Sequence, residues 1–279
     1  MISLLLPSRK RPKELMRMAT SAWCTAKNPD KVQIVVRFDD DDYDSAKAVA
    51  DIGIDPMIFG PRIREITKCW NECFEVCSGD IVCQANDDIV FITPGWDQMV
   101  EKAFEEVPDK ILLVHGNDVF GHGNRFGPHP FVHRKWVEAL GYFIPPYFCS
   151  DFGDAWPNEL ADRIGRRRYV PFDIEHHHYS YGLCEADENT LERLARHKED
   201  DPDSIYYSSE KTQERIQDAE KLAKLMSSEP DTTGWVPHAK SGVLSMGKCK
   251  NCESIMTVPA ADGKIHCNRC GKLYERVKK

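Results

Sequence analysis

Short apolar runs alternate with longer amphipathic stretches through most of the chain, and this order limits the fold more than any other feature. Runs of this kind predict buried strands, and the stretches between them have helical spacing. Such alternation is typical of a mostly parallel sheet flanked by helices, so we predict an α/β fold. The predicted strands are Ile2–Leu6, Val32–Phe38, Pro56–Phe59, Ile81–Gln84, Ile111–His115 and Tyr169–Phe172. The predicted helices between them are Lys13–Ala26, Arg64–Cys77, Gly95–Glu106, Arg134–Leu140 and Ala155–Ile164.

The pattern changes after the last predicted strand. Two polar amphipathic helices are predicted at Leu191–His197 and Glu210–Met226, and a stretch containing Pro, Gly and Ser at 229–245 is predicted to be a linker. We therefore divide the chain into an α/β domain at 1–190, a helical extension and linker at 191–245, and a small terminal domain at 246–279. A length of 279 residues is sufficient for one sizeable domain with such an appendage.

Four cysteines in the terminal domain have the spacing of a zinc ribbon. Two residues separate Cys249 from Cys252 and Cys267 from Cys270, and the fourteen residues between the pairs predict a hairpin. Four thiolates suit one tetrahedral Zn²⁺, and a segment this small buries too little apolar surface to fold without such a stabiliser. The alternative is a redox role for the two pairs.

The other cysteines are not expected to form disulfides. Cys69, Cys73 and Cys77 recur every four residues, so they share one helix face and serve as small buried side chains in a reducing compartment. We expect that compartment to be the cytoplasm. The apolar run in the first residues is too short for a secretory signal. The sequence has no apolar run of about 18 residues, which argues against a membrane partner.

The net charge of −8 conceals an acidic body and a basic end. From Ala239 onward there are nine Lys and Arg against three Asp and Glu, a net charge of +6, whereas the preceding residues have 28 basic and 42 acidic groups, a net charge of −14. A basic ribbon suits nucleic-acid phosphates. The alternative is a ribbon that docks to the rest of the chain or to another protein.

Carboxylates follow two of the predicted strands. Asp39 and Asp40 follow the second strand, and Asp87 and Asp88 lie between Ile81–Gln84 and another apolar stretch. The carboxyl ends of strands in an open α/β sheet border a ligand crevice. Paired carboxylates between buried strands need compensation, which hydrogen bonds or a hard divalent ion such as Mn²⁺ or Mg²⁺ can provide. For Asp39 and its neighbours, a solvated turn is the alternative.

A long loop is predicted at 116–130, where Gly, His and Asn are frequent. Loops of this length inside a compact domain are usually functional. The pattern does not single out any residue within it.

The order of these motifs resembles the nucleotide-sugar half of the GT-A glycosyltransferases over about Met1–Asp187. The matching motifs are Pro7-Ser8-Arg9, Asp39-Asp40, Asn71, Gly79-Asp80, Asn86-Asp87-Asp88 and Pro94-Gly95-Trp96. The resemblance implies a Rossmann-like mixed sheet with helices on both faces. It also implies a metal-dependent enzyme that moves a sugar from a nucleotide-sugar donor, a UDP-sugar by first expectation, to an acceptor hydroxyl. The donor-binding residues expected are Pro7, Ser8, Arg9, Asp39, Asp40, Arg64, Asn71 and Asp87.

The resemblance also implies a site for the Mn²⁺ or Mg²⁺ that grips the diphosphate. The acidic motif of the family begins with Asp, whereas this chain has Asn86 there, so Asp88 is the expected ligand. The family often adds a histidine from a late loop, and His176 and His178 are the residues expected here. Alternation along an extended segment places these two histidines on the same side.

A general base is implied at the start of a helix. Asp154 lies immediately before the helix predicted at Ala155–Ile164, in the position that the family's base occupies. An N-cap role is the alternative for Asp154. Asp151 is the second candidate base. Inversion of the anomeric centre is implied by the resemblance alone.

The Pro-Gly-Trp motif and the histidine-rich end resemble most closely glycosyltransferases encoded by bacteriophages, which would place the chain in the host cytoplasm. Some of these modify DNA by glycosylating hydroxymethylated pyrimidines. A basic ribbon on an acidic body suits a DNA acceptor, and this is our hypothesis. A cell-surface glycan or a protein acceptor is the alternative, as is a non-catalytic protein that binds a nucleotide-sugar or nucleic acid.

Overall fold

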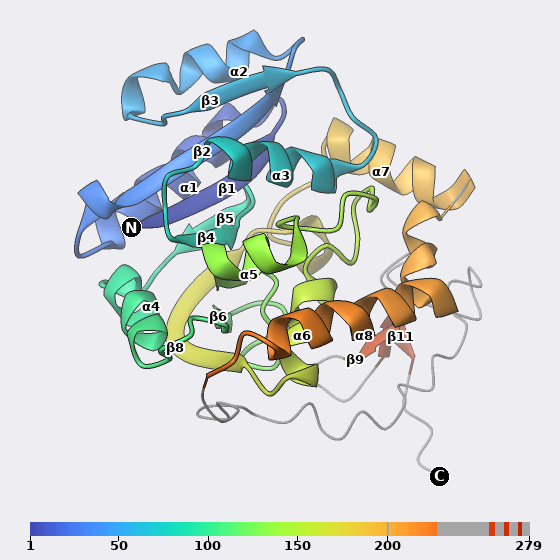
Figure 1. Ribbon diagram of the computed structural model, residues 1–279. Coiled ribbons are helices and arrows are strands. Elements are labelled where there is room, and N and C mark those ends of the chain that lie inside the picture. The colour runs from blue at the N-terminus through green and yellow to red at the C-terminus, as the bar shows by residue number, and fades with distance from the viewer. Residues whose placement is uncertain (200, 228–256, 260–264, 268–272, 275–279) are drawn as a thin grey trace. The chain divides into compact units, whose positions relative to one another are not determined.

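The computed structural model describes residues 1–199, 201–227, 257–259, 265–267 and 273–274. The chain divides into two compact units, and each is described by itself. The first comprises Met1–His177 and Pro202–Val236, and the second comprises His178–Asp201 and Pro237–Lys279. Figure 1 shows the elements of both units in chain order.

An eight-stranded mixed sheet forms the centre of the first unit, in the order β3-β2-β1-β4-β7-β6-β8-β5 (Figure 1). Strands β1 to β4 pair in parallel, β7 runs antiparallel to β4 and β6, and β5 runs antiparallel to β8. The predicted α/β fold with a mixed sheet is therefore confirmed. The strands are β1 (Ile2–Ser8), β2 (Val32–Asp39), β3 (Met57–Gly60), β4 (Ile81–Gln84), β5 (Ile89–Phe91), β6 (Leu113–Asp118), β7 (Phe131–His133) and β8 (Arg167–His176).

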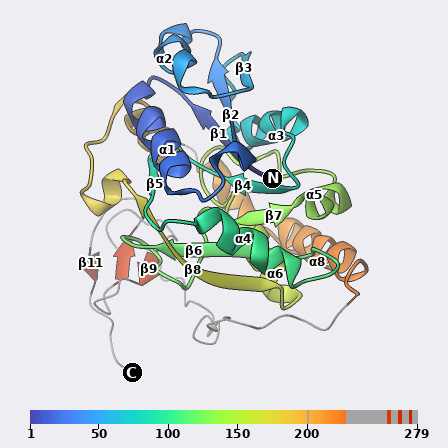
Figure 2. The ribbon, with the colours of Figure 1, turned by 90° about the vertical axis from the view of Figure 1, so that its left-hand side faces the viewer.

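Helices cover both faces of this sheet, as predicted. Figure 2 shows α1 and α3 on opposite sides of β1 and β2. Along β1 the side chains alternate, so that Leu4 and Leu6 join the core beneath α1 and α4, whereas Leu5 joins the core beneath α3, α5, α6 and α8. The α-helices of this unit are α1 (Pro12–Thr25), α2 (Tyr43–Ala48), α3 (Ile66–Val76), α4 (Trp96–Glu105), α5 (Arg134–Leu140), α6 (Ala155–Arg163) and α8 (Ser209–Ala223). The 3-10 helices are η1 (Pro29–Lys31), η2 (Ala50–Ile52) and η4 (Pro202–Tyr207).

Several features of the first unit differ from the sequence prediction, among them α2, which was not predicted, β6, which extends into the predicted loop at 116–130, and two further strands. The strand β7 was not predicted, because only three residues separate the preceding loop from α5. The strand predicted at Tyr169–Phe172 is longer and reaches His176, so the first residue of the histidine triplet belongs to the sheet. The cysteine prediction is confirmed for Cys69, Cys73 and Cys77, which are free and buried.

The described part of the second unit contains η3 (Tyr179–Tyr181), α7 (Glu188–Glu199) and three short strands. The strands β9 (Thr257–Pro259), β10 (Ile265–Cys267) and β11 (Leu273–Tyr274) form an antiparallel sheet in the order β11-β10-β9. β9 and β10 pair antiparallel, and the residues that would connect them in the predicted hairpin lie outside the described residues. Cys249, Cys252 and Cys270 lie outside the described residues, as does all of the predicted linker at 229–245, so the zinc site stays a prediction.

Among the helices of the described residues, none combines the length and the apolar character needed to cross a membrane.

Candidate active site at the carboxyl edge of the sheet

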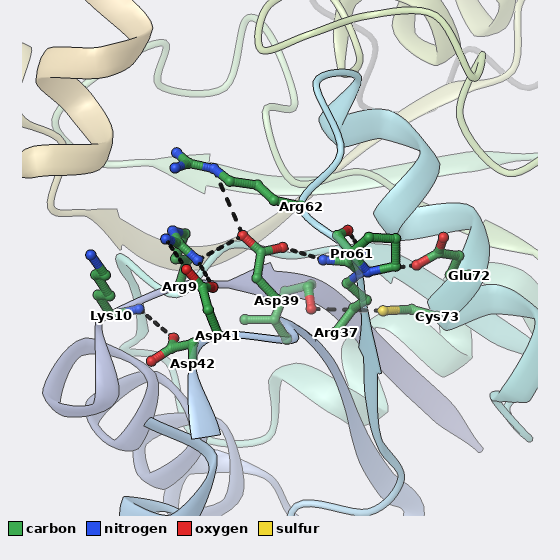
Figure 3. Close-up of polar contacts among 11 residues, drawn as sticks. Arg9, Lys10, Arg37, Asp39, Asp41, Asp42, Pro61, Arg62, Glu72 and Cys73 are labelled. Carbon is green, nitrogen blue, oxygen red and sulfur yellow. Dashed lines mark hydrogen bonds and ion pairs between the residues drawn. The ribbon is translucent and has the colours of Figure 1, made fainter. Parts of the chain in front are cut away.

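Three arginines surround the carboxylate of Asp39 at the end of β2 (Figure 3). The guanidinium of Arg37 is buried and hydrogen-bonds to Asp39, and its Nε lies 2.9 Å from Glu72 Oε2. Arg9 Nη1 donates to Asp39 Oδ2 at 3.0 Å, and Arg62 Nε lies 3.9 Å from the same oxygen. We call these five residues the Asp39 cluster. Its carboxylates are compensated by side chains of the protein itself.

Arg9 also joins the Asp39 cluster to the acidic turn that follows β2. Its guanidinium contacts Asp41 through both terminal nitrogens, with Nη2 at 2.8 Å from Oδ2. The contact lowers the pKa of Asp41 to about 2. Asp40 is exposed, and its backbone N–H donates to the carbonyl of Gly60 at 2.8 Å. The turn is therefore held by specific contacts, in contrast to the alternative of a merely solvated turn.

Two other predicted donor residues are Arg64 and Asn71. Arg64 is exposed in the loop between β3 and α3. The side-chain amide of Asn71 contacts the backbone of the segment before α6: Oδ1 accepts from the N–H of Phe143 at 2.7 Å, and Nδ2 donates to the carbonyl of Ile144 at 2.6 Å. Asn71 thus fixes this segment to α3.

Asp87 connects the ends of β1 and β4. Ser8 Oγ donates to Asp87 Oδ2 at 2.8 Å, and Arg11 Nη1 lies 3.2 Å from Oδ1. Burial raises the pKa of Asp87 to about 6, since the repulsion from Asp88 adds to burial while Arg11 and Ser8 act against it. The structure therefore brings Pro7, Ser8 and Asp87 to one edge of the sheet, as predicted for strands with parallel neighbours.

Asp88 faces His176 across the pairing of β5 and β8. His176 Nε2 lies 3.3 Å from Asp88 Oδ1, and the backbone N–H of His177 donates to the Asp88 carbonyl at 2.7 Å. Burial alone would lower the pKa of His176, but the hydrogen bond and charge of Asp88, together with the charges of Asp118 and Asp154, raise it overall. Of the predicted metal ligands, Asp88 and His176 are therefore adjacent.

The other two histidines of the triplet have their own partners. His177 Nε2 lies 3.0 Å from Glu175 Oε2. His178 belongs to the second unit, where Nδ1 lies 2.7 Å from Ser180 Oγ and Nε2 lies 3.2 Å from Arg193 Nη2. The contacts of His178 are therefore those of the second unit, whereas Asp88 belongs to the first.

Two further residues at this corner were not singled out by the sequence. His129 is 3% exposed, and its ring centroid lies 4.9 Å from that of His176. Asp118 is 2% exposed, and both residues border a small cavity with an apolar lining between β6 and the loop before β7. Among the described residues, Oδ1 of Asp118 has no hydrogen-bond partner. Burial lowers the pKa of His129 to about 3, and a hydrogen bond with the backbone of Gln84 acts in the opposite direction. The only signal in the sequence was the Gly- and His-rich loop at 116–130.

Asp88 and His176 are the two side chains of this corner that could together contact a divalent cation. They offer an oxygen and a nitrogen 3.3 Å apart, and the ring of His129 contacts that of His176. Carboxylate oxygens suit Mg²⁺ and Mn²⁺, and imidazole nitrogen is tolerated better by Mn²⁺. We call Asp88, Asp118, His129 and His176 the metal corner.

Asp154 lies at the N-terminal end of α6. It occupies the N-cap position without a side-chain capping hydrogen bond, and hydrogen bonds with the backbone of Asp154 and Ala155 act to lower its pKa. Burial raises the pKa of Asp154 to about 6, and the charge of Asp151 acts in the same direction. Because Asp154 and His176 interact electrostatically, a carboxylate that titrates near neutrality lies close to the metal corner.

The loop that carries Asp151 and leads to Asp154 is fixed by a carboxylate from η4. Asp203 has no exposed surface, and it accepts hydrogen bonds from three successive backbone N–H groups, those of Cys149, Ser150 and Asp151, at 2.6, 2.8 and 2.7 Å. Phe152 follows with a left-handed φ of 64°, and its ring stacks on Tyr206 with centroids 4.6 Å apart. This clamp joins residues more than fifty positions apart, so no local pattern could have predicted it.

Comparison with known proteins finds likeness in structure alone. No protein-family model matches the chain, and no curated protein matches its sequence. The mannosyltransferase PcManGT from Pyrobaculum calidifontis, in complex with GDP-Man and Mn²⁺, superposes with a TM-score of 0.54 and 13% identity, over 80% of this chain and 69% of that one. Residues 1–349 of TarS from S. aureus in complex with UDP give a TM-score of 0.50 and 12% identity, over 98% of both chains. In a longer TarS structure, the match covers 46% of that chain.

At these identities the likeness shows the fold. The Rossmann-like mixed sheet predicted from the GT-A resemblance is confirmed, because the eight-stranded sheet and its helices match glycosyltransferase structures.

Proposed function

We propose that this chain is a metal-dependent glycosyltransferase that moves a sugar from a nucleotide-sugar to an acceptor hydroxyl. The observation that carries the proposal is the Asp88–His176 pair, 3.3 Å apart, beside Asp154, whose pKa is raised to about 6. A cation site next to a carboxylate base is what displacement of a nucleoside diphosphate requires. The structural neighbours support the proposal, because one was solved with GDP-Man and Mn²⁺ and another with UDP.

We assign the nucleoside end of the donor to the Asp39 cluster at the carboxyl edge of the sheet. Asp39 is ion-paired with its arginines, and Asp40 lies beside it in the exposed turn. Arg9 and Arg64 supply positive charge for phosphate oxygens. Pro7, Ser8, Asn71 and Asp87 complete the proposed donor-binding set, Asn71 by fixing the segment at 143–144. A UDP-sugar is the first donor to test.

The leaving group is assigned to the metal corner. Asp88 and His176 hold the cation, and His178 is kept as the alternative histidine from the same triplet. When bound, Mn²⁺ or Mg²⁺ neutralises the charge that develops on the departing diphosphate. The hydrogen bond between the His177 backbone and the Asp88 carbonyl joins the end of β8, which carries His176, to the turn before β5, which carries Asp88.

Asp154 is the proposed base. With a pKa of about 6 it is largely ionised at neutral pH, and it remains basic enough to accept the proton of the attacking hydroxyl. Asp151, whose loop is clamped by Asp203, is the second candidate. A single displacement of this kind inverts the anomeric centre.

For the acceptor, we propose a hydroxymethylated pyrimidine in DNA, recruited by a basic zinc ribbon, in a phage-encoded enzyme acting in the host cytoplasm. The support is the net charge of +6 from Ala239 onward on an otherwise acidic chain. The four cysteines at 249, 252, 267 and 270 would hold the structural Zn²⁺. A glycan or protein acceptor is the alternative.

The test is a donor screen with the full chain and Mn²⁺, in which release of nucleoside diphosphate is measured with and without DNA that contains hydroxymethylated pyrimidines. We expect release that depends on one donor and that Asp154→Asn reduces. If none of the donors gives nucleoside diphosphate release, the chain is a binding protein rather than an enzyme. Release that DNA does not accelerate, at low as well as moderate salt, would favour the glycan or protein acceptor.

A further inference from the structure

Gln84, the last residue of β4, has a buried side-chain amide that is not fully paired. The residue is 5% exposed, and its Oε1 accepts no hydrogen bond within the part of the chain that the structure describes. Buried polar groups are nearly always paired, because an unpaired one retains the cost of leaving water. An unpaired buried amide therefore indicates a partner from outside the protein, such as a ligand.

The backbone of Gln84 is held in place. Its N–H donates to the carbonyl of Pro130 at 3.1 Å, and its backbone also takes part in a hydrogen bond with His129. On the other side, Gln84 is in register with Leu5 of β1. The missing side-chain partner is thus not a consequence of a loose strand end.

The amide of Gln84 lies against the segment that carries the proposed base. Side chains alternate along β4, so Gln84 lies on the face of Val82, which joins the core beneath α3 and α6, whereas Cys83 joins the core beneath α1 and α4. On this face, a Cβ added to Gly153 would lie 3.2 Å from Gln84 Nε2. The absence of a side chain at Gly153 therefore lets the amide pack against the residue that directly precedes Asp154.

The side chains that share this contact offer the amide no partner. The other two groups nearest to the same point of Gly153 are methyl groups, Thr67 Cγ2 at 3.2 Å and Ile144 Cγ2 at 3.4 Å. The hydroxyl of Thr67 is already used, since it donates to the Phe148 carbonyl at 3.0 Å and accepts from the Phe148 N–H at 3.1 Å. The surroundings of the amide are thus apolar or committed to other bonds.

Gln84 also connects the two halves of the proposed reaction site. It directly precedes the turn at 85–88, which carries Asp88, and its amide contacts the residue before Asp154. In a displacement of this kind, the transferred sugar lies between the departing diphosphate at the cation and the base that activates the acceptor. An amide offers a sugar hydroxyl both a donor and an acceptor, and it adds no charge between two carboxylates.

We propose that Gln84 determines the specificity for the transferred sugar, through a hydrogen bond between its amide and a hydroxyl of the sugar ring. The inference rests on the proposed transferase activity and adds a sugar-recognising residue to the donor site. A site built to pair with a hydroxyl rejects an analogue that lacks it, because the buried polar group of the protein is then left unpaired.

The kinetic test compares the full wild-type chain with Gln84→Met, a substitution of similar volume, using UDP-glucose and GDP-mannose with Mn²⁺. For the donor that is turned over, we expect Gln84→Met to lower kcat/KM about 10²-fold or more, while the Kd of the free nucleoside diphosphate stays unchanged. Among the monodeoxy derivatives of that donor, the wild type should reject one about 10²-fold relative to the parent sugar. Gln84→Met should use this derivative and the parent equally well.

Denaturant unfolding without donor gives an independent readout. Because the amide is unpaired in the free protein, Gln84→Met should not lower the unfolding midpoint. Gln33→Met is the matched control on β2, since Gln33 Oε1 accepts from Ser3 Oγ at 2.7 Å and from the N–H of Ser78 at 2.9 Å. It should lower the midpoint and leave kcat/KM unchanged.

Three results would overturn the inference. A midpoint that falls as far in Gln84→Met as in Gln33→Met would show that the amide has a structural partner. Gln84→Met that slows the parent donor and every deoxy derivative equally, or slows none of them, would exclude recognition of a hydroxyl while leaving the proposed transferase intact. A wild-type chain that releases nucleoside diphosphate from neither donor would contradict the proposed function together with the inference.

Discussion

The Asp39 cluster and the metal corner lie at the same edge of one sheet, yet their charges are compensated in different ways. Asp39 is surrounded by Arg9, Arg37 and Arg62. At the metal corner, Asp88 faces His176, and Asp118 shares its cavity with His129. The first site is complete before any ligand binds. The second has the composition of a site that a cation completes.

This difference separates two tasks of a donor site. A nucleoside is recognised by shape and hydrogen bonds. Side chains that are already fixed are an advantage here, because they lose little conformational entropy when the nucleoside binds. The negative charge on the diphosphate increases as it leaves, and a bound cation stabilises that developing charge. The comparison therefore predicts that mutations at the metal corner affect chemistry, whereas mutations in the Asp39 cluster affect stability and nucleoside binding.

The largest expected effect is that of Asp88→Ala on transfer. Loss of a ligand to the leaving-group ion should cost several kcal/mol of barrier, a decrease of about 10³-fold or more in kcat. The measurement is nucleoside diphosphate release with saturating donor and Mn²⁺. Asp80→Asn, an exposed carboxylate before β4, is the control. Near-normal turnover of Asp88→Ala would remove the metal corner from the mechanism.

Arg37→Met should have the next largest effect, which is a decrease in the stability of the folded protein. Removing the buried guanidinium leaves Asp39 and Glu72 without their principal partner, which should lower the free energy of unfolding by about 3 kcal/mol. Denaturant unfolding measures this loss. Arg62→Met is the matched control: its side chain is 44% exposed and 3.9 Å from Asp39, so it should cost less than about 1 kcal/mol. Equal losses would contradict a prebuilt Asp39 cluster.

Asp154→Asn should reduce kcat by about 10²-fold or more without weakening donor binding, because the amide cannot accept a proton. In the wild type, only the ionised carboxylate is active, so activity should fall as the pH drops through about 6. Since burial raises this pKa, ionised Asp154 disfavours the folded state above that pH, and Asp154→Asn should not lower stability at pH 7. If Asp151→Asn is inactive and Asp154→Asn is active, the base is Asp151.

Asp203→Ala should have a smaller effect, on the loop that carries Asp151. Three backbone N–H groups would lose their acceptor, and the free energy of local opening should fall by about 2 kcal/mol. Hydrogen exchange at Cys149, Ser150 and Asp151 measures the opening. Ser204→Ala, an exposed neighbour in η4, is the control. Unchanged protection of these amides would show that the clamp does not fix the loop.

Local patterns in the sequence were sufficient for most strands of the sheet and for the carboxylates at its edge. The alternation of apolar runs predicted β1, β2 and β4, and Asp39, Asp87 and Asp88 follow these strands as expected. A three-residue strand such as β7 is too short to show a period. His129 is recognisable only from its burial next to His176, which depends on pairing between distant strands. The Asp203 clamp likewise depends on tertiary contacts.

The central claim is that the protein supplies the nucleoside half of the donor site and a cation completes the diphosphate half. Titration calorimetry of UDP with the full chain, in Mn²⁺ and in chelator, tests it most directly. We expect Mn²⁺ to tighten binding about 10-fold or more, which corresponds to about 1.4 kcal/mol, and Asp88→Ala to abolish that gain. Uridine, which lacks the diphosphate, should bind equally with and without Mn²⁺. UDP binding that is as tight in chelator as in Mn²⁺ would contradict the account.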